Sequence, residues 1–224
     1  MKFNTKTIHG GQQHEKVTGS VMTPIFQTST FAQTSPGNPI GEYEYARGAN
    51  PTRTALENSL ASLENGTRGL AFASGLAAID AVLKTLKQGD EVIANDNLYG
   101  GTYRMFTKVY QEYGIKFHFV DMDNLKALEK IINNNTKLVW IETPSNPLMK
   151  LVDIVEVSKI THSKKILLAV DNTFATPYLQ KPLDLGADIV MHSATKYLGG
   201  HSDLIAGALV VKDNLLGEKL HFAQ

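Results

Sequence analysis

The sequence predicts an α/β domain in which a mostly parallel sheet is covered by helices on both faces. Two observations indicate this class: apolar and amphipathic stretches alternate from about residue 52 onward, and the apolar stretches are short and nearly continuous. A third observation is that polar side chains follow five of the apolar stretches. Parallel strands end at one edge of a sheet, so these side chains are expected to converge on one pocket.

The individual elements follow from periodicity and from turn residues. Helices are expected over residues 52–63, 75–87, 100–113, 123–134 and 153–163. Strands are expected over residues 70–73, 91–94, 116–120, 137–141, 166–170, 189–191 and 206–211. The helix over 75–87 has the clearest pattern, because its apolar residues recur on one face and Gly89 follows it.

Residues 1–50 show little regular pattern, and Pro36, Gly37 and Pro39 interrupt any helix or strand there. A floppy tail is one interpretation. The large apolar groups Phe26 and Phe31 favour another, because they need a surface to cover them. We therefore expect residues 1–50 to form an arm that contacts a neighbouring subunit, and residues 51–224 to form the ligand-binding domain.

The composition argues against several classes of partner. The 22 basic and 22 acidic residues cancel, so neither a nucleic acid nor a membrane surface is expected as a partner. No apolar run approaches the roughly 20 residues of a membrane-spanning helix. The chain has no cysteine, which excludes disulfides and thiolate catalysis and suits a cytoplasmic location. The histidines show no metal-ligand spacing, so no metal site is expected.

The strongest chemical signal is a carboxylate and a lysine after two successive strands. Asp171 ends the run 166–170, and Lys196 follows the next run together with Ser193 and Thr195. This set suits pyridoxal 5'-phosphate (PLP): the lysine forms a Schiff base, the carboxylate pairs with the pyridine nitrogen, and the hydroxyls bind the phosphate. The non-functional alternatives are that Lys196 is a solvent-exposed surface lysine and that Asp171 caps a helix or turn.

Other candidates come from neighbouring strand ends. Gly75 opens a helix, whose first N–H groups can bind a phosphate. Tyr99 is placed to stack on the pyridine ring, although a core tyrosine is the alternative. Tyr45 and Arg47 share a face if they lie in a strand, and together they can clasp a phosphate. From the residues alone they can equally be ordinary loop residues.

These motifs resemble the Cys/Met-metabolism group of PLP-dependent enzymes, which includes cystathionine γ-lyases, γ-synthases and β-lyases and methionine γ-lyases. The resemblance runs from Thr7 to the last residue. Its matching blocks are Tyr45-Ala-Arg47, Asn50-Pro-Thr-Arg53, Phe72-Ala-Ser-Gly75, Glu142-Thr-Pro-Ser-Asn146-Pro, Asp171-Asn-Thr-Phe-Ala-Thr-Pro177 and Ser193-Ala-Thr-Lys196.

The resemblance implies a PLP-dependent transferase-like fold (fold type I) with a three-layer domain. It also implies roles for single residues. Lys196 and Tyr99 would be catalytic, and the cofactor-binding set would comprise Tyr45, Arg47, Gly75, Leu76, Tyr99, Asn146, Asp171, Ser193, Thr195 and Lys196. Tyr45 and Arg47 would reach the phosphate of a neighbouring subunit, within a homotetramer. Asn146 would also contact the substrate carboxylate.

The resemblance further implies a smaller C-terminal domain, absent from this chain, that supplies the arginine for the substrate carboxylate. Methionine γ-lyases typically carry a cysteine where this chain has Gly101, which argues against that branch. Glu44 and Arg104 are placed to meet the distal groups of a cystathionine-like substrate, or are simply surface charges.

We therefore expect a PLP-dependent carbon–sulfur lyase, a cystathionine γ-lyase that converts L-cystathionine to cysteine, 2-oxobutanoate and ammonia. The alternatives are a γ-synthase, a β-lyase, a catalytically incomplete fragment that binds PLP, and a Schiff-base aldolase without PLP. Asp171 and the phosphate-binding set oppose the last of these.

Overall fold

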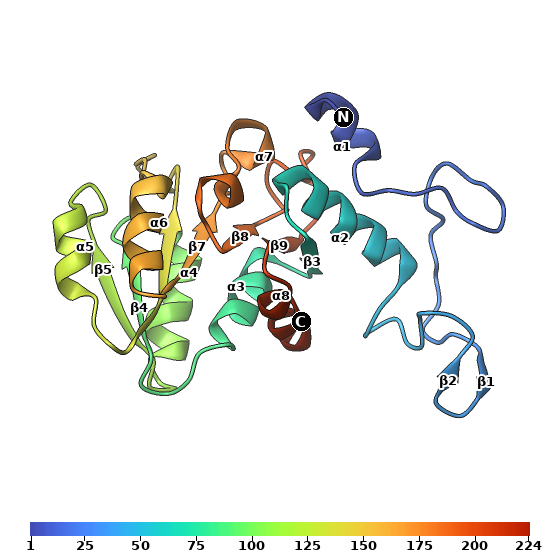
Figure 1. Ribbon diagram of the computed structural model, residues 1–224, viewed down its shortest axis with the longest axis horizontal. Helices are drawn as coiled ribbons and strands as arrows, with labels where there is room; N and C mark the ends of the chain where they lie inside the picture. The colour runs from blue at the N-terminus through green and yellow to red at the C-terminus, as the bar shows by residue number, and fades with distance from the viewer.

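A seven-stranded sheet forms the centre of the chain in the computed structural model, which describes residues 1–224 (Figure 1). Its strands are β3 (Arg68–Phe72), β4 (Glu91–Asn95), β5 (Lys116–Val120), β6 (Thr136–Glu142), β7 (Leu167–Asp171), β8 (Ile189–His192) and β9 (Gly207–Val211). They lie in the order β3-β9-β8-β7-β6-β4-β5. Strand β9 runs opposite to the other six strands, which are parallel to one another, so the predicted mostly parallel sheet is confirmed.

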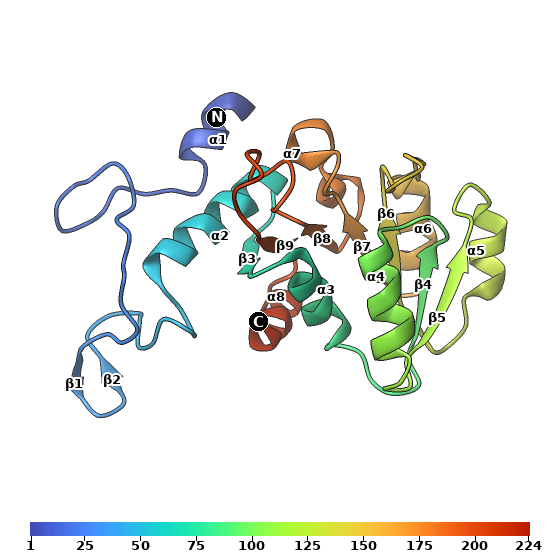
Figure 2. The same cartoon turned by 180° about the vertical axis from the view of Figure 1, so that it is seen from behind.

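Helices cover both faces of this sheet, as Figures 1 and 2 show from opposite sides. The helices are α2 (Pro51–Glu64), α3 (Gly75–Leu83), α4 (Gly100–Met105), α5 (Leu125–Ile131), α6 (Ile154–Ser163), α7 (Thr176–Leu179) and α8 (Asn214–Ala223). Side chains alternate along each strand, and alternate residues of β6 therefore belong to different cores. Trp140 belongs to the core that includes residues of α3, η1 (Phe106–Tyr110) and α8, whereas Ile141 belongs to the core that includes residues of α5 and α6. The three-layer α/β prediction is confirmed.

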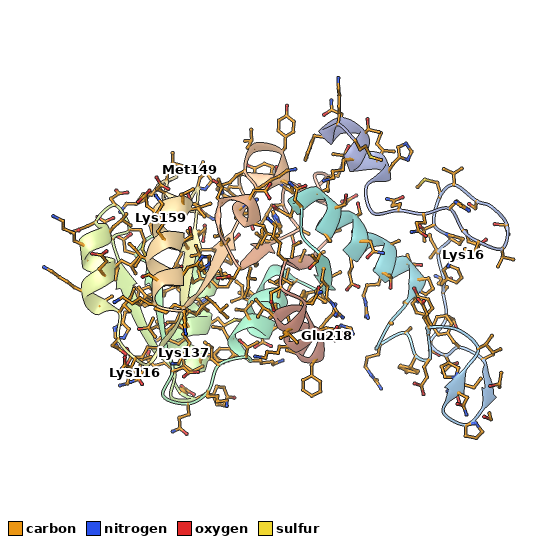
Figure 3. The ribbon with its side chains drawn as sticks, viewed as in Figure 1. Lys16, Lys116, Lys137, Met149, Lys159 and Glu218 are labelled. Atoms are coloured by element: carbon orange, nitrogen blue, oxygen red, sulfur yellow. The ribbon has the colours of Figure 1, made fainter.

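The orientation of the strands decides where polar side chains gather. Figure 3 labels Lys116 and Lys137, at the starts of β5 and β6, on one edge of the sheet, and Met149, beyond β6, on the opposite edge. The carboxyl ends of six of the seven strands thus share one edge. Loops that follow those strands can contribute to one site.

Three helices are shorter than the sequence predicts, and the one expected over 123–134 spans only Leu125–Ile131. The helix expected over 75–87 ends at Leu83. Beyond it the Thr85 hydroxyl donates to the Val82 carbonyl at 2.7 Å, and the Lys87 N–H donates to the Asp90 carboxylate at 2.8 Å. These local hydrogen bonds replace the helical ones, which is why the helix stops early.

The helix expected over 100–113 is divided into α4 and the π-helical turn η1. In η1 the Gln111 N–H donates to the Phe106 carbonyl, five residues back, at 3.0 Å. Phe106 is fully buried, with its ring centroid 4.6 Å from that of Phe117 and 6.0 Å from that of Trp140. Tertiary packing of this aromatic cluster fixes the segment, and a local periodicity cannot foresee that extra residue.

The first fifty residues extend away from the sheet beyond α2, and Figure 3 labels Lys16 on this extended part. They contain more regular structure than expected: α1 (Phe3–His9) and a short hairpin of β1 (Gln33–Ser35) and β2 (Asn38–Pro39). The Lys6 ammonium donates to Asn65 at 2.7 Å, beside the end of α2. Gly11 has a φ of +71°, and a Cβ on it would lie 2.1 Å from the Asn58 carbonyl oxygen.

Residues 1–11 therefore pack on their own chain, and the rest of the arm is largely exposed. Ile25 keeps 81% of its surface. Contact between this arm and a neighbouring subunit stays a prediction.

Candidate active site

A cavity of about 270 Å³ opens at the carboxyl edge of the sheet. It is lined by residues from several strand ends: Ser74, Gly75, Leu76, Ile79, Tyr99, Glu142, Pro144, Asn146, Asp171, Thr173, Phe174, Met191, Ser193, Thr195, Lys196 and Ile205. Eight of the predicted cofactor-binding residues are in this set: Gly75, Leu76, Tyr99, Asn146, Asp171, Ser193, Thr195 and Lys196. The predicted convergence of strand ends on one pocket is thus confirmed.

The N-terminus of α3 forms one end of the cavity. The Ser74 hydroxyl caps the helix by accepting the Ala77 N–H at 3.1 Å. The N–H groups of Gly75 and Leu76 have no acceptor within the helix, so they are available to an anion. A Cβ on Gly75 would lie 2.9 Å from the Ser193 Cβ. Glycine is thus what allows the helix N-terminus and the Ser193 loop to approach each other.

The loop after β8 carries the lysine. The Thr195 hydroxyl donates to the Ala206 carbonyl at 3.1 Å and accepts the Ala206 N–H at 3.0 Å. These bonds hold the loop to the start of β9. The role expected for the Thr195 hydroxyl at a phosphate stays a prediction. The Lys196 ammonium has no hydrogen-bond or ion-pair partner and lines the cavity, as a lysine that binds a ligand requires.

Asp171 ends β7 and is 5% exposed. Its carboxylate accepts the Thr173 N–H at 3.0 Å and the Thr173 hydroxyl at 2.5 Å. Burial raises the pKa of Asp171, although the Thr173 hydrogen bonds and the charge of nearby His192 oppose that shift. A cation inside the cavity would favour the ionised form, because an opposite charge at short range stabilises a buried carboxylate.

Glu142 is a cavity residue to which the sequence assigned no role. It ends β6 directly beside Asp171 on β7, and the two residues are register partners. Its Oε2 accepts the Tyr99 N–H and its Oε1 accepts the Asn146 N–H, both at 2.7 Å. Burial and the charge of Asp171 together raise the pKa of Glu142 to about 7. Its position at the end of an apolar strand was the signal that could have identified it.

Tyr99 and Asn146 stand on the two loops that Glu142 joins. Tyr99 precedes α4 and is 45% exposed, so its ring is available for stacking. A Cβ on Gly101 would lie 2.3 Å from Cε1 of the Tyr99 ring. The Tyr99 ring therefore lies against the backbone of Gly101. A side chain at position 101 would clash with the ring in this position.

Four predicted residues lie outside this cavity. The Arg47 guanidinium lies 4.8 Å above the Tyr45 ring, but Arg47 is in a turn, so the strand premise for the pair is wrong. Glu44 accepts a hydrogen bond from Gln33 at 3.3 Å, within the arm. Arg104 lies in the last turn of α4. The roles expected for these residues, across a subunit boundary or toward substrate, stay predictions.

The comparison with known protein families identifies the class. The family model described as "Cys/Met metabolism PLP-dependent enzyme" matches residues 4–224. The chain belongs to this family, which confirms the resemblance inferred from the sequence blocks.

Individual relatives carry three different names. A cystathionine γ-lyase of Bacillus subtilis (strain 168) is 53% identical over 100% of this chain and 59% of its own length. A probable cystathionine γ-synthase of Herpetosiphon aurantiacus is 51% identical over 99% of this chain and 69% of its own. A cystathionine β-lyase of Lactococcus lactis subsp. cremoris is 53% identical over 99% of this chain and 58% of its own.

Solved structures agree with this assignment. The crystal structure of cystathionine γ-lyase from Lactobacillus plantarum complexed with L-serine superposes with a TM-score of 0.96 at 48% identity. The match covers 100% of this chain and 58% of that one, so the chain spans about three fifths of the length of this relative. The predicted PLP fold is confirmed.

The residues present fit PLP, the cofactor of the family. The helix N-terminus at Gly75 can take a phosphate, the buried Asp171 faces the same cavity, and the Lys196 amine is without a partner. Tyr99 supplies an exposed aromatic face.

No helix of the chain combines the length and the apolar character that crossing a membrane requires.

Proposed function

We propose that the protein is a cystathionine γ-lyase, which cleaves L-cystathionine with water to cysteine, 2-oxobutanoate and ammonia. The observation that carries this proposal is the cavity itself, in which Lys196, Asp171, Tyr99 and the N-terminus of α3 face one another. Relatives named γ-lyase, γ-synthase and β-lyase are about equally similar to this chain, so the choice among these reactions rests on the placement of Glu44 and Arg104.

Each residue has a definite task in this reaction. When bound, PLP supplies an electron sink for negative charge at the substrate α-carbon. Asp171 would pair with the ring nitrogen and keep it protonated, while Gly75, Leu76, Ser193 and Thr195 would hold the phosphate. The Lys196 amine takes the proton from the α-carbon and then moves a proton from the β-carbon. The γ-carbon–sulfur bond then breaks, and the thiol leaves as cysteine.

Tyr99 and Asn146 orient the reacting groups. The Tyr99 ring would stack on the cofactor and its hydroxyl would assist Lys196, whereas the Asn146 amide would contact the cofactor hydroxyl and the substrate carboxylate. Glu44 and Arg104 would meet the distal ammonium and carboxylate of cystathionine. Glu44 would do so from a neighbouring subunit, since it lies in the arm of its own chain.

A homotetramer with shared active sites follows from the same proposal. Tyr45 and Arg47 lie together but away from the cavity of their own chain, so they would complete the phosphate site of a paired subunit. The arm that carries them has exposed apolar side chains, which such a pairing would cover. A cytoplasmic location is proposed with it, from the absence of cysteine.

Product analysis tests the reaction. The purified protein is loaded with PLP and supplied with L-cystathionine, and the keto acid and the thiol are identified by mass spectrometry. The proposal predicts 2-oxobutanoate and cysteine. Pyruvate with homocysteine would contradict it and indicate a β-lyase. Cystathionine formed from cysteine and an O-acylhomoserine, with no keto acid from cystathionine, would contradict it in favour of a γ-synthase.

A further inference from the structure

One side chain connects the two loops that carry Tyr99 and Asn146. The two oxygens of the Glu142 carboxylate accept one backbone N–H each, from Tyr99 and from Asn146, and both distances are 2.7 Å. Charge-assisted hydrogen bonds of this length are among the stronger ones in proteins. A neutral amide in place of the carboxylate has only one oxygen and could keep only one of the two bonds.

The position of Glu142 is itself well fixed. Its backbone N–H donates to the Asn95 side chain at 3.0 Å, and its residue exposure is 5%. A separate hydrogen-bond group joins the same two loops without touching the Tyr99 or Asn146 amides. There the Asn97 side chain accepts the Ser145 hydroxyl, and it also accepts the Leu148 N–H at 3.3 Å.

We propose that Glu142 is a positioning residue of the cofactor site, whose carboxylate sets the stacking ring of Tyr99 and the side chain of Asn146 through their backbone amides. It does so beside Asp171, its register partner on the next strand, about 5 Å away at the backbone. This inference rests on the proposed function and adds a residue to it. Glu142 is assigned no contact with the reacting atoms.

The charge of Glu142 matters as well as its hydrogen bonds. The titratable groups lining the cavity are Tyr99, Glu142, Asp171 and Lys196. On the other face of the sheet His192 and Glu64 form a buried pair with 2.6 Å between Nε2 and Oε1. Two buried carboxyl groups side by side resist double ionisation, whereas a protonated pyridine opposite them favours it. Cofactor binding is therefore linked to the ionisation of Glu142.

The test compares cofactor affinity and amide exchange in matched variants. Trp140 is the only tryptophan and lies two residues before Glu142, so quenching of its fluorescence reports PLP binding to the cofactor-free protein. In Glu142→Gln the Kd for PLP is expected to rise about tenfold, the effect of losing one hydrogen bond to a charged group. Hydrogen exchange at the Tyr99 and Asn146 amides is expected to accelerate, with the amides of β6 still protected.

Two controls separate this role from general loop packing. Asn97→Ala loosens the same loops but leaves both amide bonds to Glu142, so its PLP affinity should fall by less than that of Glu142→Gln. Glu129→Gln makes the same chemical change at an exposed position and should match the parent. Parent-like affinity or parent-like amide exchange in Glu142→Gln would overturn the inference, and so would an equal loss in Asn97→Ala.

The pH profile provides a readout that loop packing does not move. The pKa of Glu142 is raised to about 7, so the parent should bind PLP more tightly as the pH rises through 7. In Glu142→Gln the affinity for PLP should not show this rise around pH 7. Identical pH dependence of the Kd in parent and variant would overturn the inference. If the parent itself fails to bind PLP, the proposed function fails. If the parent binds and the variant behaves identically, only the role of Glu142 fails.

Discussion

Replacing Gly75 by alanine tests the phosphate end of the site with a single methyl group. The new Cβ would lie 2.9 Å from the Ser193 Cβ, 3.0 Å from its Oγ and 3.1 Å from the Met191 Cε. The nearest of these atoms is the Cβ of Ser193, which is fixed to the backbone and cannot rotate away. The N-terminus of α3 and the Ser193 loop must therefore separate.

Two competing contributions decide whether Gly75→Ala strengthens or weakens the site. Alanine favours a helix over glycine by up to about 1 kcal/mol. Overpacking at a buried contact costs about 1–3 kcal/mol and displaces the groups that it separates. Because the displaced groups are the ones expected to bind the phosphate, most of this cost should appear in cofactor binding. A cost of about 1–3 kcal/mol corresponds to a roughly 5- to 150-fold rise in the Kd for PLP.

The assay is a PLP titration of the cofactor-free variant, followed through Trp140 fluorescence, with thermal unfolding measured alongside. Gly100→Ala is the matched control, because Gly100 also opens a helix but a Cβ there would meet no atom within 4 Å. The control should bind PLP like the parent. Parent-like affinity and an unchanged Tm in Gly75→Ala would refute the assignment of this helix N-terminus to the phosphate.

Three further predictions concern the lysine and the buried charges. Lys196→Ala should abolish cystathionine turnover and the visible absorption of lysine-bound PLP, and retention of either would contradict the role of Lys196. The free energy of unfolding of the cofactor-free chain should fall as pH rises from about 4.5 to about 7. In that range unfolded Glu142 has lost its proton while folded Glu142, with its pKa raised to about 7, keeps it. The part of this fall attributable to Glu142 is about 3 kcal/mol. Urea titrations at several pH values measure it, and a Glu142→Gln variant whose free energy of unfolding fell with pH as much as that of the parent would refute it. Glu64→Ala leaves His192 buried without its 2.6 Å partner and should lower the free energy of unfolding by about 3–5 kcal/mol, whereas a value like that of the exposed control Glu129→Ala would contradict the pairing.

Periodicity sufficed to predict the parts of the fold that hydrophobic burial determines. The strand runs ending near Glu142, Asp171 and His192 are apolar on both faces, and the sheet places them side by side in the expected layer. What periodicity missed depends on contacts distant in sequence. The π-helical turn after Met105 follows from packing against Phe117 and Trp140, and no local pattern encodes it.

The residues of the candidate site were likewise only partly predictable from the sequence. Lys196 and Asp171 could be predicted because their chemistry is specific and each follows an apolar strand. Glu142 was overlooked because its partners are the backbone amides of Tyr99 and Asn146, which look the same in every sequence. Thr195 lines the cavity as expected, and its hydroxyl also binds the Ala206 backbone, so its role at the phosphate stays a prediction.

The most direct test of the central claim is to locate the cofactor on the chain. The protein is loaded with PLP and reduced with borohydride, which makes the lysine–cofactor linkage permanent, and the modified peptide is identified by mass spectrometry. We predict modification at Lys196 and at none of the other lysines. Stoichiometric modification of a different lysine, or none from a protein that has bound PLP, would contradict the assignment of this cavity as the active site.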